Sequence, residues 1–173
     1  IDTSVYVEKA ADAGTCAHAM VHADIMGTDP QLEAAKYGAE LADLGSNGYL
    51  QWLDWRKGRK IAPVVSEQPL VSERHQYGGT VDLFGLLEED EELMDFKTSD
   101  SGIWPEMRYQ VAAYFKLLEE NGYHPKRARI IRLGKKAIEG SFDTEVVQDI
   151  EGHFQMFLLC RQVYDLQKQL EMR

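Results

Sequence analysis

The stretch TVDLFGLLEEDEELMDFK, residues 80–97, predicts a β-hairpin. Its apolar and β-branched runs, 80–87 and 93–97, have the composition of strands. The acidic segment 88–92 between them is expected to form the turn. Because the two runs carry charged residues in their middle, this hairpin decides both the fold and the candidate chemistry.

Two aspartates and one lysine of the hairpin are predicted to share one face. Asp82 and Asp95 are equidistant from a turn centred between Glu88 and Glu89, so antiparallel pairing makes them cross-strand neighbours with Cβ atoms roughly 5 Å apart. Lys97 follows Asp95 by two residues and therefore points to the same side. Adjacent like charges destabilise a sheet unless a counter-ion compensates them. A bound cation would compensate the two carboxylates. This arrangement indicates a metal-dependent phosphodiester-cleaving site.

A solvated polar face beside a core face is the simpler interpretation of an Asp-x-Lys strand. Leu83, Met94 and Phe96 alternate with the charged residues and are expected to form the core face. The charged residues, however, lie in mid-strand rather than at fraying ends. This position favours the cation site, and the polar-face alternative stays open.

The composition is that of one domain, spanning 1–173. The chain has 173 residues, 44% of them hydrophobic, which is enough for one substantial core. No run approaches the 18 apolar residues of a membrane span. Cys16 and Cys160, far apart in sequence, are expected to be reduced, packed thiols, which favours a cytoplasmic (intracellular) protein.

The charge distribution limits the kinds of nucleic-acid contact. A net charge of −10 argues against a protein that coats nucleic acid, because such binding needs a basic surface. Positive charge is concentrated in two basic clusters, within 56–60 and 126–136. Each alone is typical of a solvated face. If the hairpin cleaves phosphodiesters, these clusters are the expected phosphate contacts, with the acidic segment 88–92 pointing away from the nucleic acid.

The order of predicted elements indicates an α/β fold. Helices are expected first, then strands, then a helix, further strands and a closing helix. A mixed central sheet flanked by helices follows from that order. The ranges are helices over 17–26 (after a Gly14-Thr15 start), 31–44 and 48–57, a strand over 62–71, the hairpin, a helix over 105–120, strands over 126–133 and 142–146, and a helix over 147–170.

His18 and His22 lie one turn apart on the first predicted helix. The zinc-protease interpretation of this spacing fails, because that motif needs Glu directly after the first histidine and this chain has Ala19. His18 can complete a site built from aspartates or be a hydrogen-bonded structural residue.

Further candidates flank the hairpin. Gln110 and Tyr114 form an i, i+4 polar pair that either caps groups at the sheet edge or reaches the site. Trp104 can stack a nucleobase or fold onto the core. Glu67 can reach a second metal or be merely exposed.

Five short motifs in this order resemble the RecB-like branch of the PD-(D/E)xK nucleases, in particular its stand-alone, often phage-encoded exonucleases. The resemblance covers roughly 14–133, and its specificity comes from the combination of motifs. These are Gly14-Thr15-x-x-His18, Glu67, Gly79-Thr80-Val81-Asp82, Asp95-Phe96-Lys97-Thr98 and Gln110-x-x-x-Tyr114.

The resemblance implies a fold and a set of roles. It implies the restriction-endonuclease-like αβββαβ core and a site for Mg²⁺ or Mn²⁺. Hard carboxylate ligands suit Mg²⁺, and an imidazole shifts the preference toward Mn²⁺. The implied ligands are His18, Asp82, Asp95 and the backbone carbonyl of Phe96, with catalysis by Asp82, Asp95 and Lys97 and support from Gln110 and Tyr114.

The chain also departs from its relatives. Val81 stands where the wider superfamily has proline, which is common in this branch. Two cysteines cannot hold the iron–sulfur cluster of some relatives, so none is expected, and no phosphate loop for a helicase is present.

The expected function is a metal-dependent DNA exonuclease in recombination, repair or phage DNA processing. It would act on single-stranded DNA or duplex ends. The alternatives are a non-catalytic nucleic-acid-binding or assembly module and an endonuclease, including one directed at RNA or modified DNA. A homo-oligomer or a recombination partner protein would fit, but the sequence identifies no interface.

Overall fold

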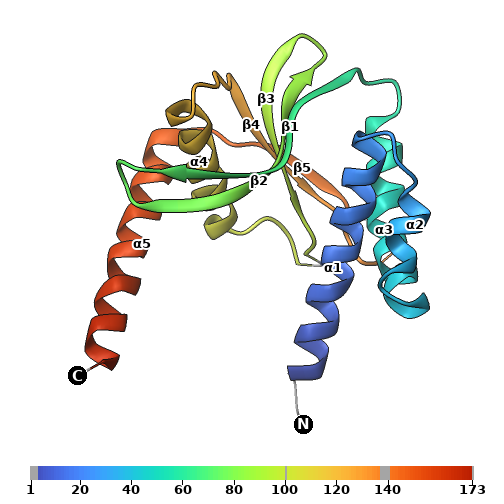
Figure 1. Cartoon of the computed structure of the whole chain (residues 1–173), viewed down its shortest axis with the longest axis horizontal. Helices are drawn as coiled ribbons and strands as arrows, with labels where there is room; N and C mark the ends of the chain where they lie inside the picture. The colour runs from blue at the N-terminus through green and yellow to red at the C-terminus, as the bar shows by residue number, and fades with distance from the viewer. Residues whose placement is uncertain (1–3, 100, 137–140, 173) are drawn as a thin grey trace.

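In the computed structural model, which describes residues 4–99, 101–136 and 141–172, a five-stranded sheet lies between two groups of helices (Figure 1). Helices α1 to α3 cover one face, and α4 and α5 lie on the other side. The predicted α/β class, with a mixed sheet flanked by helices, is confirmed. The elements are α1 Ser4–Ile25, α2 Pro30–Ala35, α3 Ala39–Arg56, β1 Ile61–Ser72, β2 Tyr77–Leu87, β3 Asp90–Lys97, α4 Pro105–Glu120, β4 Arg127–Arg132, β5 Asp143–Val146 and α5 Ile150–Glu171.

The strands follow one another across the sheet in chain order. Three neighbouring pairs, β1 with β2, β2 with β3 and β4 with β5, are antiparallel, whereas β3 and β4 are parallel. A parallel pair needs a crossover connection, and α4 supplies it. Within the described ranges, no helix has the length and apolar character needed to cross a membrane.

The β2–β3 hairpin has the predicted register. Leu83 pairs with Met94, so continuing the pairing by one residue sets Asp82 opposite Asp95. Leu83, Met94 and Phe96 lie in the core cluster that contains residues of α1 and α3. The predicted core face is therefore confirmed, whereas the opposite face is not only charged, because Phe84 and Leu93 pack there with residues of α4.

The turn of this hairpin is shorter than predicted. Only Glu88 and Glu89 connect the strands, with Glu88 at a φ of 59°. Glu92, expected in an exposed acidic turn, is instead fully buried in β3. Its carboxylate forms ion pairs with Arg127 and Arg129 of the parallel strand β4. Because these guanidinium groups compensate its charge, Glu92 can occupy the interior.

The first helices have different bounds from those predicted. Helix α1 starts at Ser4, so Gly14-Thr15 lies inside it. The predicted helix over 31–44 is wrong, because the chain breaks at 36–38, where Gly38 has a φ of 81°. Helix α3 then continues through the segment 45–47, which was expected to separate two helices. The other elements start and end within three residues of their predicted bounds.

Glycines inside α3 allow it to pack closely against α1. A Cβ atom at Gly45 would lie 2.7 Å from Sγ of Cys16, and one at Gly48 would lie 3.3 Å from Cβ of Ala17. Glycine in a helix usually costs stability, but here it lets the two backbones approach. Cys16 is packed as predicted, whereas Cys160 is exposed on α5. The close α1–α3 contact holds α1, which carries His18, against the sheet.

Candidate metal centre

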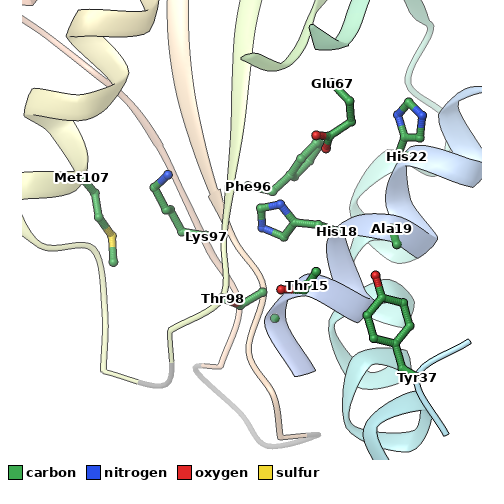
Figure 2. Close-up of a pocket in the computed structure, with 11 residues that line it drawn as sticks. Thr15, His18, Ala19, His22, Tyr37, Glu67, Phe96, Lys97, Thr98 and Met107 are labelled. Carbon is green, nitrogen blue, oxygen red and sulfur yellow. The ribbon is translucent and has the colours of Figure 1, made fainter. Parts of the chain in front are cut away.

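Side chains from three elements converge beside the hairpin. His18 of α1, Glu67 of β1 and Asp82 of β2 each offer one ligand atom, and these atoms all lie within 4.8 Å of one another. His18 and Glu67, together with Lys97 of β3, line an open cleft of about 680 Å³ (Figure 2). The antiparallel β1–β2–β3 meander brings the strand residues together, and α1 crosses beside it to add the imidazole.

Asp95 is a buried carboxylate with unsatisfied oxygens. Its side chain is 1% exposed, and Nζ of Lys97 lies 2.7 Å from its Oδ2. Beyond this ion pair with Lys97, neither carboxylate oxygen has a hydrogen-bond partner among the described residues. Leaving such a group unsatisfied is costly. This buried carboxylate lies opposite Asp82, one of the three converging ligand residues, so the two aspartates together concentrate negative charge that a cation would compensate.

The two aspartates hold their protons more tightly than usual. Burial raises the pKa of Asp82 and of Asp95 from 3.8 to about 6, and the Lys97 ammonium only partly opposes this. The charge of Asp82 contributes to the raised pKa of Asp95. Both groups are therefore mostly ionised at neutral pH, in buried positions where a compensating positive charge would stabilise them.

The raised pKa values predict how the stability of the metal-free protein depends on pH. A carboxyl with a raised folded-state pKa contributes stability fully below pH 3.8 and loses it as the pH rises through about 6. His18 acts oppositely, because its pKa is lowered, so the effect must be measured as a difference. We expect the free energy of unfolding of Asp82→Asn, measured by urea denaturation in EDTA, to rise relative to that of the wild type. The difference between the two proteins should increase by about 1 kcal/mol from pH 5 to pH 8. A difference independent of pH would contradict the raised pKa.

Asp82 is held by bonds that the sequence analysis missed. The Phe96 N–H donates to Oδ2 of Asp82 over 2.8 Å. The Ser66 hydroxyl donates to the Asp82 backbone carbonyl over 3.2 Å and lies 2.8 Å from Nδ1 of His22. His22, noted only as a neighbour of His18, thus helps anchor the strand beside the site. Nothing in the sequence signals the part played by Ser66.

His18 has the protonation state of a metal ligand. Burial lowers its pKa, although Asp95 and a hydrogen bond to the Phe96 backbone oppose the shift. Its Nδ1 lies 4.0 Å from Oδ2 of Asp82. A neutral imidazole is the form that binds metals. The Phe96 backbone therefore lies at the cluster, where the resemblance expects a carbonyl ligand.

Glu67 adopts a strained backbone conformation at the site. Its φ is 49°, and β1 pairs with β2 at Ser66 and Gln68 but not at Glu67. A left-handed conformation at a non-glycine residue costs of order 1–3 kcal/mol and is common at functional sites. Although the side chain is exposed, desolvation raises the pKa of this carboxyl. The structure thus brings Glu67 to His18 and Asp82.

Tyr114 and Gln110 of α4 form one unit. The Gln110 amide donates to the Tyr114 hydroxyl over 2.8 Å. The ring packs so closely on β2 that a Cβ atom at Gly79 would lie 2.5 Å from its Cε1. Burial, and then the charge of Asp95, raise the pKa of Tyr114. The phenol therefore stays neutral, and it lies close enough to Asp95 for the charge of this carboxylate to affect its pKa.

Trp104 is not brought to the cleft. It precedes the first turn of α4 and is 50% exposed. Within the described ranges, the side chain that α4 contributes to the cleft lining is Met107. Trp104 is not among the residues that line this cleft, so the lining does not support its candidate role in stacking a base.

Several arginines of the two basic clusters form ion pairs or hydrogen bonds within the protein. Arg56 pairs with Asp24, and Arg129 pairs with the buried Glu92. Arg132 is buried and donates to two backbone carbonyls. The guanidinium groups of these three arginines therefore have internal partners, and the expectation that the clusters hold phosphates stays a prediction.

In comparisons with known proteins, no protein-family model and no curated protein matches this sequence.

Proposed function

We propose that the chain is a divalent-cation-dependent DNA nuclease of the PD-(D/E)xK type, acting as an exonuclease. The observation that carries the proposal is the convergence of His18, Glu67 and Asp82 beside the buried Asp95–Lys97 pair. After three N-terminal helices the order is three strands, a helix and a strand, with β3 parallel to β4, which is consistent with the restriction-endonuclease-like core.

The residues present fit a Mg²⁺ or Mn²⁺ ion. The holding groups would be the side chains of His18, Glu67, Asp82 and Asp95, and the backbone carbonyl of Phe96. Carboxylate and carbonyl oxygens with one imidazole are a hard donor set suited to these cations. When bound, the cation would supply positive charge to the scissile phosphate and increase the acidity of water.

Lys97 is suited to stabilise charge rather than to accept a proton. Burial alone would lower its pKa, but Asp95 and then Asp82 outweigh burial and the pKa is raised. The ammonium therefore stays charged at neutral pH. It lies at the cleft wall, where it can bind a phosphate oxygen and neutralise the charge that develops there.

Tyr114 and Gln110 act as positioning residues in this proposal. The ring packs beside Gly79, three residues before Asp82, and so supports the strand that carries this carboxylate. Their hydrogen bond fixes the phenol without placing a charge in the site. Loss of either side chain would loosen the site rather than remove a reacting group.

An end-directed mode of action fits the charge distribution. With a net charge of −10 and three arginines in internal contacts, the protein offers a long duplex less positive charge than the two basic clusters of the sequence suggest. A strand end entering the cleft needs fewer phosphate contacts. We therefore favour an exonuclease over an endonuclease.

The test compares end-labelled linear DNA with closed circular DNA in Mg²⁺ and in Mn²⁺. The proposal expects degradation of the linear substrate, resistance of the circle and complete inhibition by EDTA. Nicking of the circle would indicate an endonuclease. If wild type and Asp95→Asn both leave every substrate intact, including RNA, the chain is a non-catalytic module and the proposal is wrong.

A further inference from the structure

Helix α5 has two apolar faces, and only one of them packs on the protein. Phe154, Phe157 and Leu158 contact Ala112 and Ala113 of α4. Beyond this contact the helix extends away from the sheet toward the C-terminus (Figure 1). Its last turns, from Gln162 onward, are exposed.

The second face is a regular apolar row. Its spacing alternates between three and four residues, which is the repeat of a coiled-coil seam. At 100° per residue, this row lies roughly opposite the face that packs on α4. Its five residues, 40% to 59% exposed, are Met156, Leu159, Val163, Leu166 and Leu170.

The details of this seam favour pairing with an identical helix. In heptad positions, Met156, Val163 and Leu170 occupy a, and Leu159 and Leu166 occupy d. Of the three a residues, Val163 is β-branched, and a β-branched a residue with leucine at d favours parallel, two-stranded coils.

The residues flanking the seam are uncharged. The e and g positions are Gln155, Cys160, Gln162, Gln167 and Gln169. A chain of net charge −10 repels its copies, but these neutral flanks add no repulsion at the seam. They also lack the basic residues that a membrane surface or an acidic partner would select.

We infer that α5 pairs in parallel, along this seam, with α5 of a second copy of the chain. Because the seam is opposite the packed face, the two sheets lie on opposite sides of the helix pair and do not compete for space. The interface is isologous, so each seam residue meets its own equivalent. Gln162 of one copy then lies beside Gln167 of the other.

Sedimentation equilibrium on the full chain tests the association. Wild type should be a dimer, and Leu166→Glu should raise the dimer dissociation constant by at least about 100-fold, because it buries two facing carboxylates. Tyr164→Glu is the matched control, since Tyr164 is equally exposed at 57% on the same helix but off the seam. A monomeric wild type, or equal weakening by both variants, would overturn the inference.

Oxidative cross-linking tests the orientation. In a Cys160→Ser background, Leu166→Cys places a thiol at a d position, where equivalent residues face each other in a parallel pair. Rapid formation of a disulfide-linked dimer is expected, and none from Tyr164→Cys in the same background. A dimer that fails to cross-link through Leu166→Cys would overturn the parallel arrangement.

Discussion

Replacing Asp95 with asparagine is expected to abolish DNA cleavage and, at the same time, to stabilise the metal-free protein. The two effects have one cause, which is the buried negative charge. The substitution keeps the size of the side chain but removes a charged ligand, so the rate of cleavage should fall by about 10³-fold or more. The fall should appear at saturating Mn²⁺ as well as at low Mn²⁺.

The gain in stability follows from the pKa of Asp95. Burial raises this pKa to about 6 from 3.8, so at pH 7.5 the folded protein carries a carboxylate that it disfavours. Removing the charge should raise the free energy of unfolding in EDTA by about 1 kcal/mol or more, because the loss of the contact with Lys97 offsets part of the gain.

Asp165→Asn is the matched control for this variant. Asp165 lies on α5 and is 53% exposed, and its Oδ2 is 3.7 Å from Nε of Arg161. Its replacement should leave cleavage unchanged and stability within about 0.5 kcal/mol. An Asp95→Asn protein that cleaves at the wild-type rate, or that is less stable than wild type in EDTA, would contradict this account of the site.

Lys97→Met is expected to separate cation binding from cleavage. The Lys97 ammonium lies 2.7 Å from Oδ2 of Asp95, where it competes with a cation for the carboxylate. Its removal should leave Mn²⁺ affinity at pH 8 equal to or higher than that of the wild type. Single-turnover cleavage at saturating Mn²⁺ should fall by about 10²- to 10³-fold, because the charge that neutralises the phosphate is gone.

The control for Lys97→Met is Lys168→Met on α5. Lys168 is 55% exposed and pairs with Glu171, and its loss should change neither Mn²⁺ affinity nor cleavage. Calorimetry measures the affinity and end-labelled linear DNA measures the rate. Wild-type cleavage by Lys97→Met would remove Lys97 from the mechanism.

The hairpin could be predicted from the sequence because its information is local. Alternating residues set the two faces, and the symmetry of Asp82 and Asp95 about Glu88-Glu89 sets the register. The burial of Glu92 could not be predicted, because it depends on arginines more than 30 residues away on β4.

The helix bounds and the support of the site also depended on distant contacts. Gly45 and Gly48 usually indicate a break in a helix, but here they allow α3 to approach α1. The bonds from Ser66 to His22 and to the Asp82 carbonyl join α1, β1 and β2, and no local pattern encodes them. The charged residues of the site were visible in the sequence, whereas the bonds that position them were not.

Binding of Mn²⁺ in the absence of DNA tests the central claim most directly, because it does not depend on the choice of substrate. Electron paramagnetic resonance measures free Mn²⁺ as the protein is titrated at pH 7.5. We expect saturable binding by the wild type and at least about tenfold weaker binding by Asp82→Asn and by His18→Ala. The absence of binding to the wild type, or equal binding by all three proteins, would contradict a metal centre built from His18, Glu67, Asp82 and Asp95.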